Sequence, residues 1–345
     1  MLTCLRLPDA TGWLPAKVLS SPNLARRSWL SKSLALAFLL HPFWLAVGGG
    51  LYLHAEPSGI ADHPASPGQV VAQSFFNVAV VADVQYADKP AVGNRAYAAS
   101  QSKFQEAVIA FNQQELVFGL DLGDLIDGNR EKSATDLQTI MAVGNQLKVP
   151  WRHVIGNHCL GEMARSDVLK AHGMTNAYYS FDYEGWRFVV LDGMDVSHWS
   201  EPDSFEARLS VEYERKGPPF YLFNGAVGPR QMAWLRDTLQ SASRRGLPVI
   251  VCCHLPTLAA ASNPGLLLWN HPQVLRIIEN SKCVRAYFAG HDHPGGYAFQ
   301  RGIHHVTFPG MVESPANAYA ILKVYKNRIE ILGAGQIPSR NLTWP

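Results

Sequence analysis

Short apolar runs and stretches of helical periodicity alternate along the chain from residue 75 onward. Runs rich in β-branched and aromatic residues predict buried strands, because a strand covered on both faces carries few polar positions. These runs occupy residues 75–82, 116–121, 149–155, 178–182, 187–192, 249–253, 284–289, 303–308, 319–325 and 328–332. Apolar positions at helical spacing predict helices over residues 94–112, 135–147, 228–245 and 266–280. Strands that alternate with helices indicate a layered α/β fold with a largely parallel sheet.

Two hairpins and one irregular segment interrupt this alternation. The strands that flank residues 183–185, and those that flank residues 326–327, are predicted to pair as hairpins. Residues 195–225 have weak periodicity, many charges and the pair Pro218 and Pro219. We interpret residues 195–225 as an insertion that reaches over a functional site, because long irregular segments in compact domains are often functional.

The first 70 residues are predicted to be a leader outside the folded domain, which we place at residues 71–345. Residues 33–53 are apolar and uncharged, and a run of roughly 20 such residues just spans a bilayer. Pro42 and the glycines at 48–50 weaken this run as one helix. A linker rich in Pro, Ser and Gly follows it. A membrane anchor, a cleaved secretory signal and an organelle transit segment all fit, so we expect a cleaved, organelle-directing leader or an anchor through residues 33–53, and otherwise a cytoplasmic protein.

Composition and charge exclude some classes of protein. A hydrophobic content of 47% and a charged content of 17% are typical of a globular chain. Residues 33–345 carry 25 basic and 27 acidic side chains, which argues against a nucleic-acid partner. Five cysteines without CxxC spacing argue against a disulfide framework and a cysteine zinc site, and favour a reducing compartment.

Side chains that can ligate metals follow five of the predicted strands. They are Asp83 and Gln85, Asp124, Asn157, His254, and His291 with His293. Each alone has a structural explanation, such as a turn residue, a helix cap or a buried histidine. Together, at the carboxyl ends of strands at one edge of one sheet, they indicate a metal site.

The ligand types narrow the choice of metal. Carboxylate, carboxamide and imidazole ligands without thiolate suit manganese, magnesium, iron(II) or zinc. Seven ligands exceed the needs of one tetrahedral zinc ion and divide well between two ions. A bridging carboxylate is then expected, and Asp124 is the candidate by its position.

The order of these motifs resembles the calcineurin-like metallophosphoesterase superfamily. The motifs are Asp-x-Gln at 83–85, Gly-Asp-x-x-Asp at 123–127, Gly-Asn-His at 156–158, a histidine at 254 and Gly-His-x-His at 290–293. Gln85 stands where the superfamily usually has histidine, and this narrows the resemblance to the manganese-dependent ADP-ribose/CDP-alcohol diphosphatase family. Residues 223–235, 282–297, 302–306 and 333–340 also look like that family, so the resemblance covers about residues 75–340. It implies a layered α/β/β/α sandwich.

The resemblance also implies a site and a reaction. One ion, most often manganese, would be held by Asp83, Gln85, Asp124 and His293, and a second by Asp124, Asn157, His254 and His291. His158 would stand near the scissile phosphate as the catalytic acid or electrostatic stabiliser. The implied enzyme is a monomeric dinuclear-metal hydrolase. It would cleave the diphosphate bond of ADP-ribose, CDP-choline or CDP-glycerol, by hydroxide attack on phosphorus, to a nucleoside monophosphate and a phosphate ester.

Other functions and residues stay open at the sequence level. Another phosphodiesterase or phosphatase of the superfamily is one alternative, and a scaffold that binds proteins without catalysis is another. Asp127 is interpreted as a helix cap, with a contact to the site as the alternative, and Cys159 replaces the acid that the superfamily usually has there. Cys253 and His305 are candidate substrate contacts. The insertion offers four more candidates, namely Phe205, Arg208, Tyr213 and Phe223.

Overall fold

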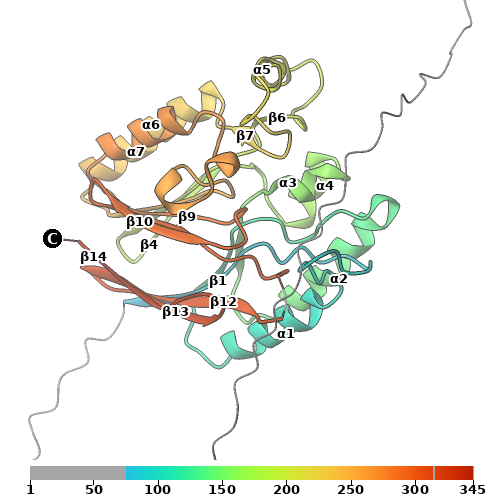
Figure 1. Cartoon of the computed structure of the whole chain (residues 1–345). Coiled ribbons are helices and arrows are strands. Elements are labelled where there is room, and N and C mark those ends of the chain that lie inside the picture. The colour runs from blue at the N-terminus through green and yellow to red at the C-terminus, as the bar shows by residue number, and fades with distance from the viewer. Residues whose placement is uncertain (1–74, 314, 345) are drawn as a thin grey trace, which may run out of the picture. The chain divides into compact units, whose positions relative to one another are not determined.

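A computed structural model describes residues 75–313 and 315–344, and two six-stranded sheets form its centre (Figure 1). The first sheet has the order β14-β13-β12-β1-β2-β3. Its strands are β1 (Phe76–Val81), β2 (Phe118–Asp121), β3 (Trp151–His153), β12 (Ala318–Val324), β13 (Arg328–Gly335) and β14 (Arg340–Thr343). Only β1, β2 and β3 are parallel, and the C-terminal strands add to β1 as an antiparallel meander.

The second sheet has the order β10-β11-β9-β8-β5-β4. Its strands are β4 (Tyr179–Tyr183), β5 (Trp186–Val190), β8 (Val249–Cys252), β9 (Val284–Ala289), β10 (Gly296–Gln300) and β11 (Ile303–Thr307). The four inner strands are parallel, while β4 and β10 are antiparallel edges. The prediction of a largely parallel sheet is therefore corrected to two mixed sheets, because the strands of the predicted hairpins join these sheets in antiparallel orientation.

The inner faces of the two sheets pack through aromatic rings. Phe118 of β2 lies 5.3 Å from Phe181 of β4 and 5.1 Å from Phe188 of β5, measured between ring centroids. Phe181 and Phe188 stack on each other at 5.1 Å. Full burial of such a ring stabilises the fold by about 2–3 kcal/mol. This core holds the two sheets in one orientation, and so holds the loops at their ends.

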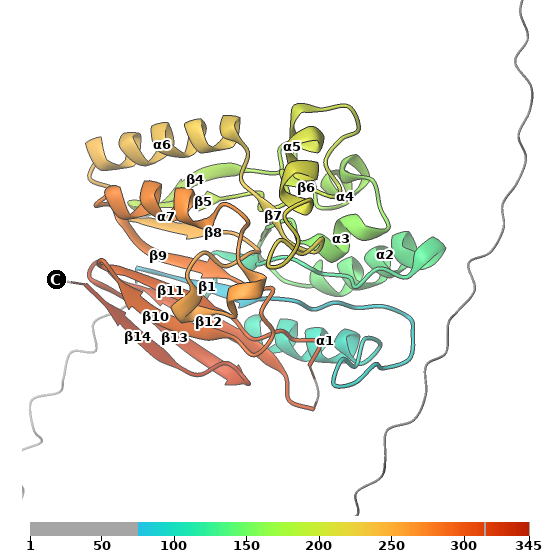
Figure 2. The same cartoon turned by 45° about the horizontal axis from the view of Figure 1, so that its top comes forward.

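Helices cover the outer faces of both sheets (Figure 2). The long ones are α1 (Ser100–Phe111), α2 (Ser133–Gly144), α6 (Pro229–Arg244) and α7 (His271–Asn280). On the first sheet, Phe104 of α1 packs on Trp151 of β3 at 5.6 Å. On the second sheet, Arg187 of β5 donates a hydrogen bond to the carbonyl of Thr238 in α6. The layers are therefore α/β/β/α, which confirms the predicted sandwich.

Shorter elements gather at one end of the sandwich (Figure 2). They are the 3₁₀ turns η1 (Arg130–Lys132), η2 (Ala259–Ala261) and η3 (Pro264–Leu266), the helices α3 (Asn157–Gly161), α4 (Arg165–Ala171) and α5 (Phe205–Glu214), and the two-residue strands β6 (Val196–Ser197) and β7 (Gly225–Ala226). The strands β6 and β7 pair at the two ends of the predicted insertion. The helix α5 between them begins where the Ser204 hydroxyl accepts the amide N–H of Ala207.

Several predicted boundaries differ from the observed ones for local reasons. The helix predicted from residue 266 begins at His271, because Pro272 occupies its first turn and the preceding residues form η3. The helix predicted from residue 94 begins at Ser100, because Arg95 pairs in an isolated bridge with Glu313. The strand β14 was not predicted, since in this edge strand only Leu342 is buried.

The predicted leader, including its apolar run at 33–53, lies outside the described residues. Within the described part of the chain, no helix combines the length and the hydropathy needed to cross a bilayer.

Candidate metal centre

The predicted ligands lie on loops that leave both sheets at the same end. Asp83 and Gln85 follow β1, Asp124 follows β2 and Asn157 begins α3 after β3. The three histidines follow strands of the other sheet, namely β8 for His254 and β9 for His291 and His293. The expectation of one edge of one sheet is therefore corrected, since the site joins the carboxyl ends of two sheets.

Hydrogen bonds from main-chain amides hold these loops together across the two sheets. The amide N–H of Gln85 donates to the carbonyl of Asp124 at 2.8 Å, and this bond joins the loops after β1 and β2. The amide N–H of Gly290 donates to the carbonyl of His254 at 3.0 Å. The amide N–H of His291 donates to Asp83 Oδ2 at 2.9 Å, which ties the second sheet to the first. The ligand loops therefore form one connected unit.

Four of the seven predicted ligands adopt left-handed backbone conformations. Their φ angles are 49° for Asp83, 42° for Gln85, 57° for Asp124 and 69° for His291. Such angles are uncommon for residues other than glycine, and they persist only where the surroundings impose them. A Cβ at Gly156 would lie 2.1 Å from Asp124 Oδ1, so the loop after β3 needs glycine there. The strained backbone at these four positions thus directs the side chains toward the other predicted ligands.

The side chains form two groups that meet at Asp124. Asp124, His254 and His291 each offer a ligand atom, and these atoms lie within 4.8 Å of one another. In the other group, His293 Nε2 lies 3.4 Å from Asp83 Oδ1 and 3.1 Å from Gln85 Nε2. Asp124 Oδ2 lies 3.0 Å from His254 Nε2 and 3.4 Å from Gln85 Nε2, so this carboxylate touches both groups. Asp124 therefore lies between the two groups, where the sequence predicts a bridging carboxylate.

Unsatisfied atoms in the site fit divalent cations. Within the described structure, four buried side-chain atoms of the predicted ligands make no hydrogen bond of acceptable geometry, namely Asp83 Oδ1, Gln85 Oε1, Asn157 Oδ1 and His254 Nε2, although the last lies close to Asp124. A buried polar atom without a partner costs free energy, so such atoms usually indicate a missing water or ion. Three are oxygens and one is an imidazole nitrogen, which are the donor types that manganese and related ions accept.

Two of these groups carry the charge of a metal ligand, whereas the third, His254, holds a proton that a bound ion would have to displace. Burial alone would lower the pKa of His254, but the carboxylates of Asp124 and Asp83 outweigh it and raise this pKa to about 9. Burial would raise the pKa of Asp124, yet His254 and His158 hold it well below its ordinary value. Burial, and next the charge of His254, lower the pKa of His291 to about 3. The carboxylate of Asp124 is thus ionised and His291 is neutral, as ligation requires.

Residues outside the predicted set orient the three histidines. The ring Nδ1 of His254 donates to the carbonyl of Leu122 at 2.9 Å. The ring Nε2 of His291 donates to Asn224 Oδ1 at 2.9 Å, and the ring Nδ1 of His293 donates to Glu313 Oε1 at 2.8 Å. Each bond leaves the other ring nitrogen for the centre, as second partners of metal-bound histidines commonly do. Sequence reasoning missed Asn224 and Glu313 as members of the site, because neither belongs to a motif at a strand end.

His158 lies at the edge of the centre beside Asp127. Its amide N–H donates to Asp124 Oδ1 at 2.8 Å, and its ring Nδ1 lies 2.9 Å from the carbonyl oxygen and 3.2 Å from Oδ1 of Asp127. The interpretation of Asp127 as a helix cap is corrected, because Asn129 precedes η1 and Lys132 precedes α2 at the cap positions. Cys159 is buried away from this contact, so the acid beside His158 comes from residue 127.

The protein-family comparison now decides the family. The family model of calcineurin-like phosphoesterases matches residues 76–295. The chain belongs to the calcineurin-like phosphoesterase family. A solved structure described as a dimetal phosphatase from Danio rerio is 28% identical to this phosphoesterase, with a TM-score of 0.76, and the match covers 79% of this chain and 100% of that chain.

Curated relatives identify the family within the calcineurin-like phosphoesterases to which the chain belongs. A relative from Oryza sativa subsp. japonica is 34% identical over 77% of this chain and 93% of its own length. Another from Arabidopsis thaliana is 33% identical over 79% of this chain and 98% of its own length. Both are named manganese-dependent ADP-ribose/CDP-alcohol diphosphatase. The phosphoesterase belongs to the same family as these relatives, and it is a metal-dependent hydrolase.

A cavity of about 600 Å³ opens above the predicted ligands of the phosphoesterase. Residues from the ligand loops, the insertion and the segment before β12 line it, among them Arg95, Asp127, His158, Glu162, Trp199, Phe223, Leu266, Asp292 and Glu313. Of the four candidates in the insertion, Phe223 lines this cavity. Tyr213 instead stacks on Trp269 at 5.3 Å. Trp199 was not predicted, because no motif marks it.

Two candidate substrate contacts do not reach this cavity. Cys253 is fully buried, and its sulfur packs beside Gly193. His305 is 2% exposed and stacks on Tyr287 of β9 at 5.9 Å. Neither side chain lines the cavity, because both lie within the packed layers of the second sheet.

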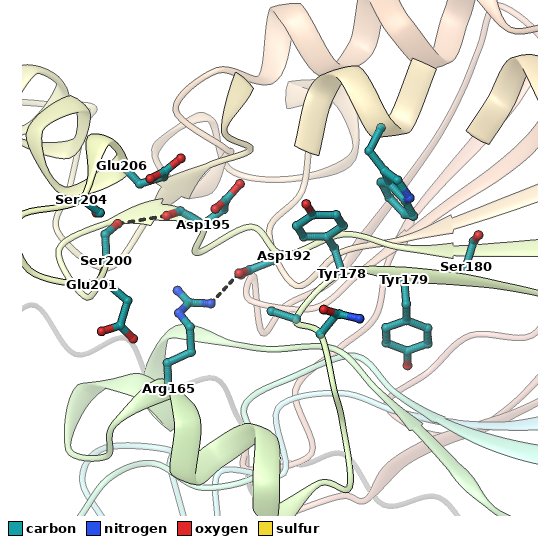
Figure 3. A pocket seen from close by; sticks show the side chains of 13 residues that line it. Arg165, Tyr178, Tyr179, Ser180, Asp192, Asp195, Ser200, Glu201, Ser204 and Glu206 are labelled. Atoms are coloured by element: carbon teal, nitrogen blue, oxygen red, sulfur yellow. Dashed lines mark hydrogen bonds and ion pairs between the residues drawn. The ribbon is translucent and has the colours of Figure 1, made fainter. Parts of the chain in front are cut away.

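A second cleft of about 590 Å³ lies at the base of the insertion (Figure 3). None of the predicted metal ligands lines this cleft. Arg165 of α4 projects toward Asp192 and donates a second hydrogen bond to the carbonyl of Met194 at 2.7 Å. Asp195 Oδ2 accepts hydrogen bonds from the amide of Gly228 and from the side chain of Gln231, each at 2.9 Å. This cluster fastens the insertion to α4 and α6, next to the catalytic cavity.

Proposed function

We propose that this phosphoesterase hydrolyses the diphosphate bond of ADP-ribose and of CDP-alcohols, with release of AMP or CMP and a phosphate ester. One observation carries the proposal, namely that ligands from two sheets converge on Asp124 with four of their buried donor atoms unsatisfied. The names of relatives that cover most of the chain supply the substrate class.

The residues divide into two sets of ligands. We assign Asp83, Gln85, Asp124 and His293 to one ion, and Asp124, Asn157, His254 and His291 to the other. Two bound manganese ions would supply Lewis-acid polarisation of the phosphoryl oxygens and a water of lowered pKa. The buried carboxylates, and the imidazoles once they have lost their protons, would hold that chemistry in place, since strained loops and hydrogen-bonded rings position each donor.

His158 assists the departure of the leaving group in this proposal. Its ring Nδ1 is held at Asp127, so Nε2 is the ring atom left to serve the cavity. From there the ring stabilises the phosphate oxygen of the breaking diphosphate bond, by a hydrogen bond or by proton donation. Asp127 keeps the ring in this orientation, and Lys89 in turn pairs with Asp127.

The nucleoside would bind against the aromatic wall of the cavity. Trp199 and Phe223 come from the insertion and line the cavity with Leu266. Phe223 is 40% exposed, and its ring lies between those of Tyr221 at 5.2 Å and His291 at 5.9 Å, so its exposed part can contact a base beside the ligand loops. Stacking on an aromatic ring tolerates both adenine and cytosine, because every base has a π-face. This wall therefore suits substrates that differ in their base.

An assay of product release tests the proposal. The full-length chain is incubated with ADP-ribose or CDP-choline and with manganese or magnesium, and AMP or CMP is measured. We expect release with manganese. We expect at least about a 100-fold loss in Asn157→Ala, which removes one metal ligand. The matched control is Asn145→Ala, an exposed asparagine at the end of α2, and it should keep full activity.

The outcomes separate the proposal from its alternatives. Hydrolysis of bis-p-nitrophenyl phosphate without any release from ADP-ribose or CDP-choline would indicate another phosphodiesterase. The absence of hydrolysis of all three substrates with either metal would indicate a scaffold. Full activity in Asn157→Ala would contradict the ligand assignment.

The monomeric state and the destination of the chain stay predictions. We propose that residues 1–70 act in targeting or anchoring, on the basis of their charge and of the apolar run at 33–53. Fractionation of cells that express the full-length chain tests this, with a variant lacking residues 33–53 as the comparison. An unchanged distribution would exclude a targeting role for these residues.

A further inference from the structure

The walls of the catalytic cavity are rich in negative charge. Four carboxylates line it, those of Asp127, Glu162, Asp292 and Glu313. Among the described residues that line this cavity, Arg95 is the only arginine or lysine. A diphosphate is strongly anionic, and two ions at the ligand loops would neutralise the phosphate that is attacked. The adjoining phosphate needs a cation of its own, and we propose that Arg95 binds it.

The guanidinium group of Arg95 is placed to bind a ligand. Its side chain is 38% exposed. Its Nη1 lies 3.9 Å from Asp127 Oδ1 and its Nε lies 3.8 Å from Glu313 Oε1, which exceed hydrogen-bond distances. Lys89 nearby is committed to Asp127 and to the carbonyl oxygen of Gly128 at 2.8 Å. The donors of Arg95 are therefore free to form the forked pair of bonds that guanidinium makes with phosphate.

The main chain fixes the position of Arg95. Its amide N–H donates to the carbonyl of Val92 at 3.0 Å, and Val92 returns the bond at 3.1 Å. The next residue, Ala96, donates to the carbonyl of Val312 at 3.0 Å. These bonds join the loop after β1 to the segment that carries Glu313. A side chain on such a fixed backbone loses less entropy when it binds a phosphate.

Two carboxylates each connect Arg95 to a histidine of the site. Asp127 contacts both Arg95 and the ring of His158. Glu313 contacts both Arg95 and the ring of His293. The two phosphates of a diphosphate share one bridging oxygen. When the attacked phosphorus lies among the metal ligands and His158, the oxygens of its neighbour lie among the side chains just beyond them, where Arg95 stands.

This inference rests on the proposed function and adds a basis for specificity. Arg95 makes the enzyme select a diphosphate over an ester with a single phosphate. The second phosphate gains charge-assisted hydrogen bonds that a single phosphate cannot form. A substrate with one phosphate uses the metal ligands and His158 alone, so it is indifferent to Arg95.

Kinetics on two substrates test the inference. In Arg95→Ala we expect kcat/KM for ADP-ribose to fall about 100-fold, as loss of a charge-assisted pair predicts. We expect kcat/KM for bis-p-nitrophenyl phosphate, which has one phosphate, to stay within about threefold of the wild-type value. Arg95→Lys should restore part of the loss, because it keeps the charge without the fork. Arg301→Ala is the matched control, since Arg301 is exposed and pairs with Glu279 outside the cavity.

Two kinetic outcomes would overturn the inference. Equal losses on both substrates would mean that Arg95 only supports Asp127 and Glu313. No loss on ADP-ribose would mean that the second phosphate binds elsewhere.

A binding measurement separates this inference from the proposed function. The affinities of AMP and of α,β-methylene-ADP for the manganese-loaded full-length chain are measured by calorimetry. We expect the wild type to bind the methylene diphosphate at least about tenfold more tightly than AMP, and Arg95→Ala to lose that preference. If the wild type shows this preference but releases no AMP from ADP-ribose, the proposed function is wrong, whereas the proposed role of Arg95 in binding the second phosphate is supported. Absence of the preference in the wild type, or its survival in Arg95→Ala, would refute the role of Arg95.

Discussion

At the scale of single residues, the centre depends on side chains that do not ligate metals. Glu313 is the clearest example, because its Oε1 lies 2.8 Å from the ring Nδ1 of His293. A carboxylate in this place fixes the tautomer of the ring and makes its other nitrogen a stronger ligand. Burial opposes the protonated form of His293, yet Asp83 and Glu313 raise its pKa above the ordinary value. Metal binding must therefore displace a proton that these carboxylates favour.

Substitution of Glu313 should weaken metal binding. We expect Glu313→Ala to reduce the affinity for manganese about 10- to 100-fold, because His293 loses the partner that orients it. Glu313→Gln should lose less, since its amide oxygen still accepts the bond from Nδ1. Calorimetric titration of the metal-free protein measures both values. Glu115→Gln, an exposed glutamate before β2, is the control, and an unchanged affinity in Glu313→Ala would contradict the role of Glu313.

At the scale of elements, the insertion is held to the body by a buried polar cluster. Asp195 near β6 accepts bonds from the amide of Gly228 and from the side chain of Gln231 in α6. Asp192 after β5 pairs with Arg165 of α4. Burial, and next the charge of Asp192, raise the pKa of Asp195 to about 6. The cluster that carries Trp199 and Phe223 to the cavity is therefore sensitive to pH.

The raised pKa of Asp195 predicts a change of stability with pH. Between its ordinary pKa of 3.8 and about 6, the folded chain binds this proton and the unfolded chain releases it. The contribution of Asp195 to stability therefore falls as pH rises through this window, and it stays low above it. Asp195→Asn keeps an oxygen that accepts both bonds and removes the titration.

Thermal unfolding tests this prediction at pH 4.5 and pH 7.5. We expect Asp195→Asn to raise Tm at pH 7.5 by about 3 °C or more, and to change Tm much less at pH 4.5. Asp203→Asn is the control, since Asp203 is exposed in the same insertion and Asn tolerates its φ of 62°. Equal shifts at both pH values would show that the effect is not the titration of Asp195.

At the scale of the whole molecule, the metal centre is formed by residues from both sheets and connects them. Asp83 and Asp124 come from the first sheet and are fully buried, whereas His254 and His291 come from the second. Two buried carboxylates repel each other unless cations neutralise them. Ions at this site would therefore stabilise the contact between the sheets as well as perform chemistry.

Removal of metal should lower the stability of the fold. A ligand at about 100 times its Kd stabilises a protein by about 2.7 kcal/mol, which corresponds to a Tm rise of about 5 °C in a domain of this size. We expect Tm of the EDTA-treated chain to rise by about this amount when manganese returns. Asn157→Ala should show a smaller rise, and Asn145→Ala the full one. A Tm that is independent of manganese would contradict a metal centre that joins the sheets.

Local sequence patterns predicted the buried strands but neither the edge strand β14 nor the order of strands in the sheets. Apolar runs predicted β1, β2, β8 and β9, because a strand buried on both faces is mostly apolar. The strand β14 carries polar residues at an edge, so no run marks it. The order of strands within two sheets depends on contacts between distant segments, such as β1 with β12. Local patterns do not contain that information.

The sequence by itself determined the chemical character of the site. Carboxylates, carboxamides and imidazoles at the ends of apolar runs have no stable place in a core unless something binds them, so their positions alone predicted metal ligands. Only the tertiary structure decided that Asp127 stands beside His158, that Glu313 supports His293 and that Arg95 faces the cavity. Asp127, Glu313 and Arg95 belong to loops, where a side chain acquires its partner from the packing of segments far apart along the chain. Local hydrophobic periodicity contains no information about that packing.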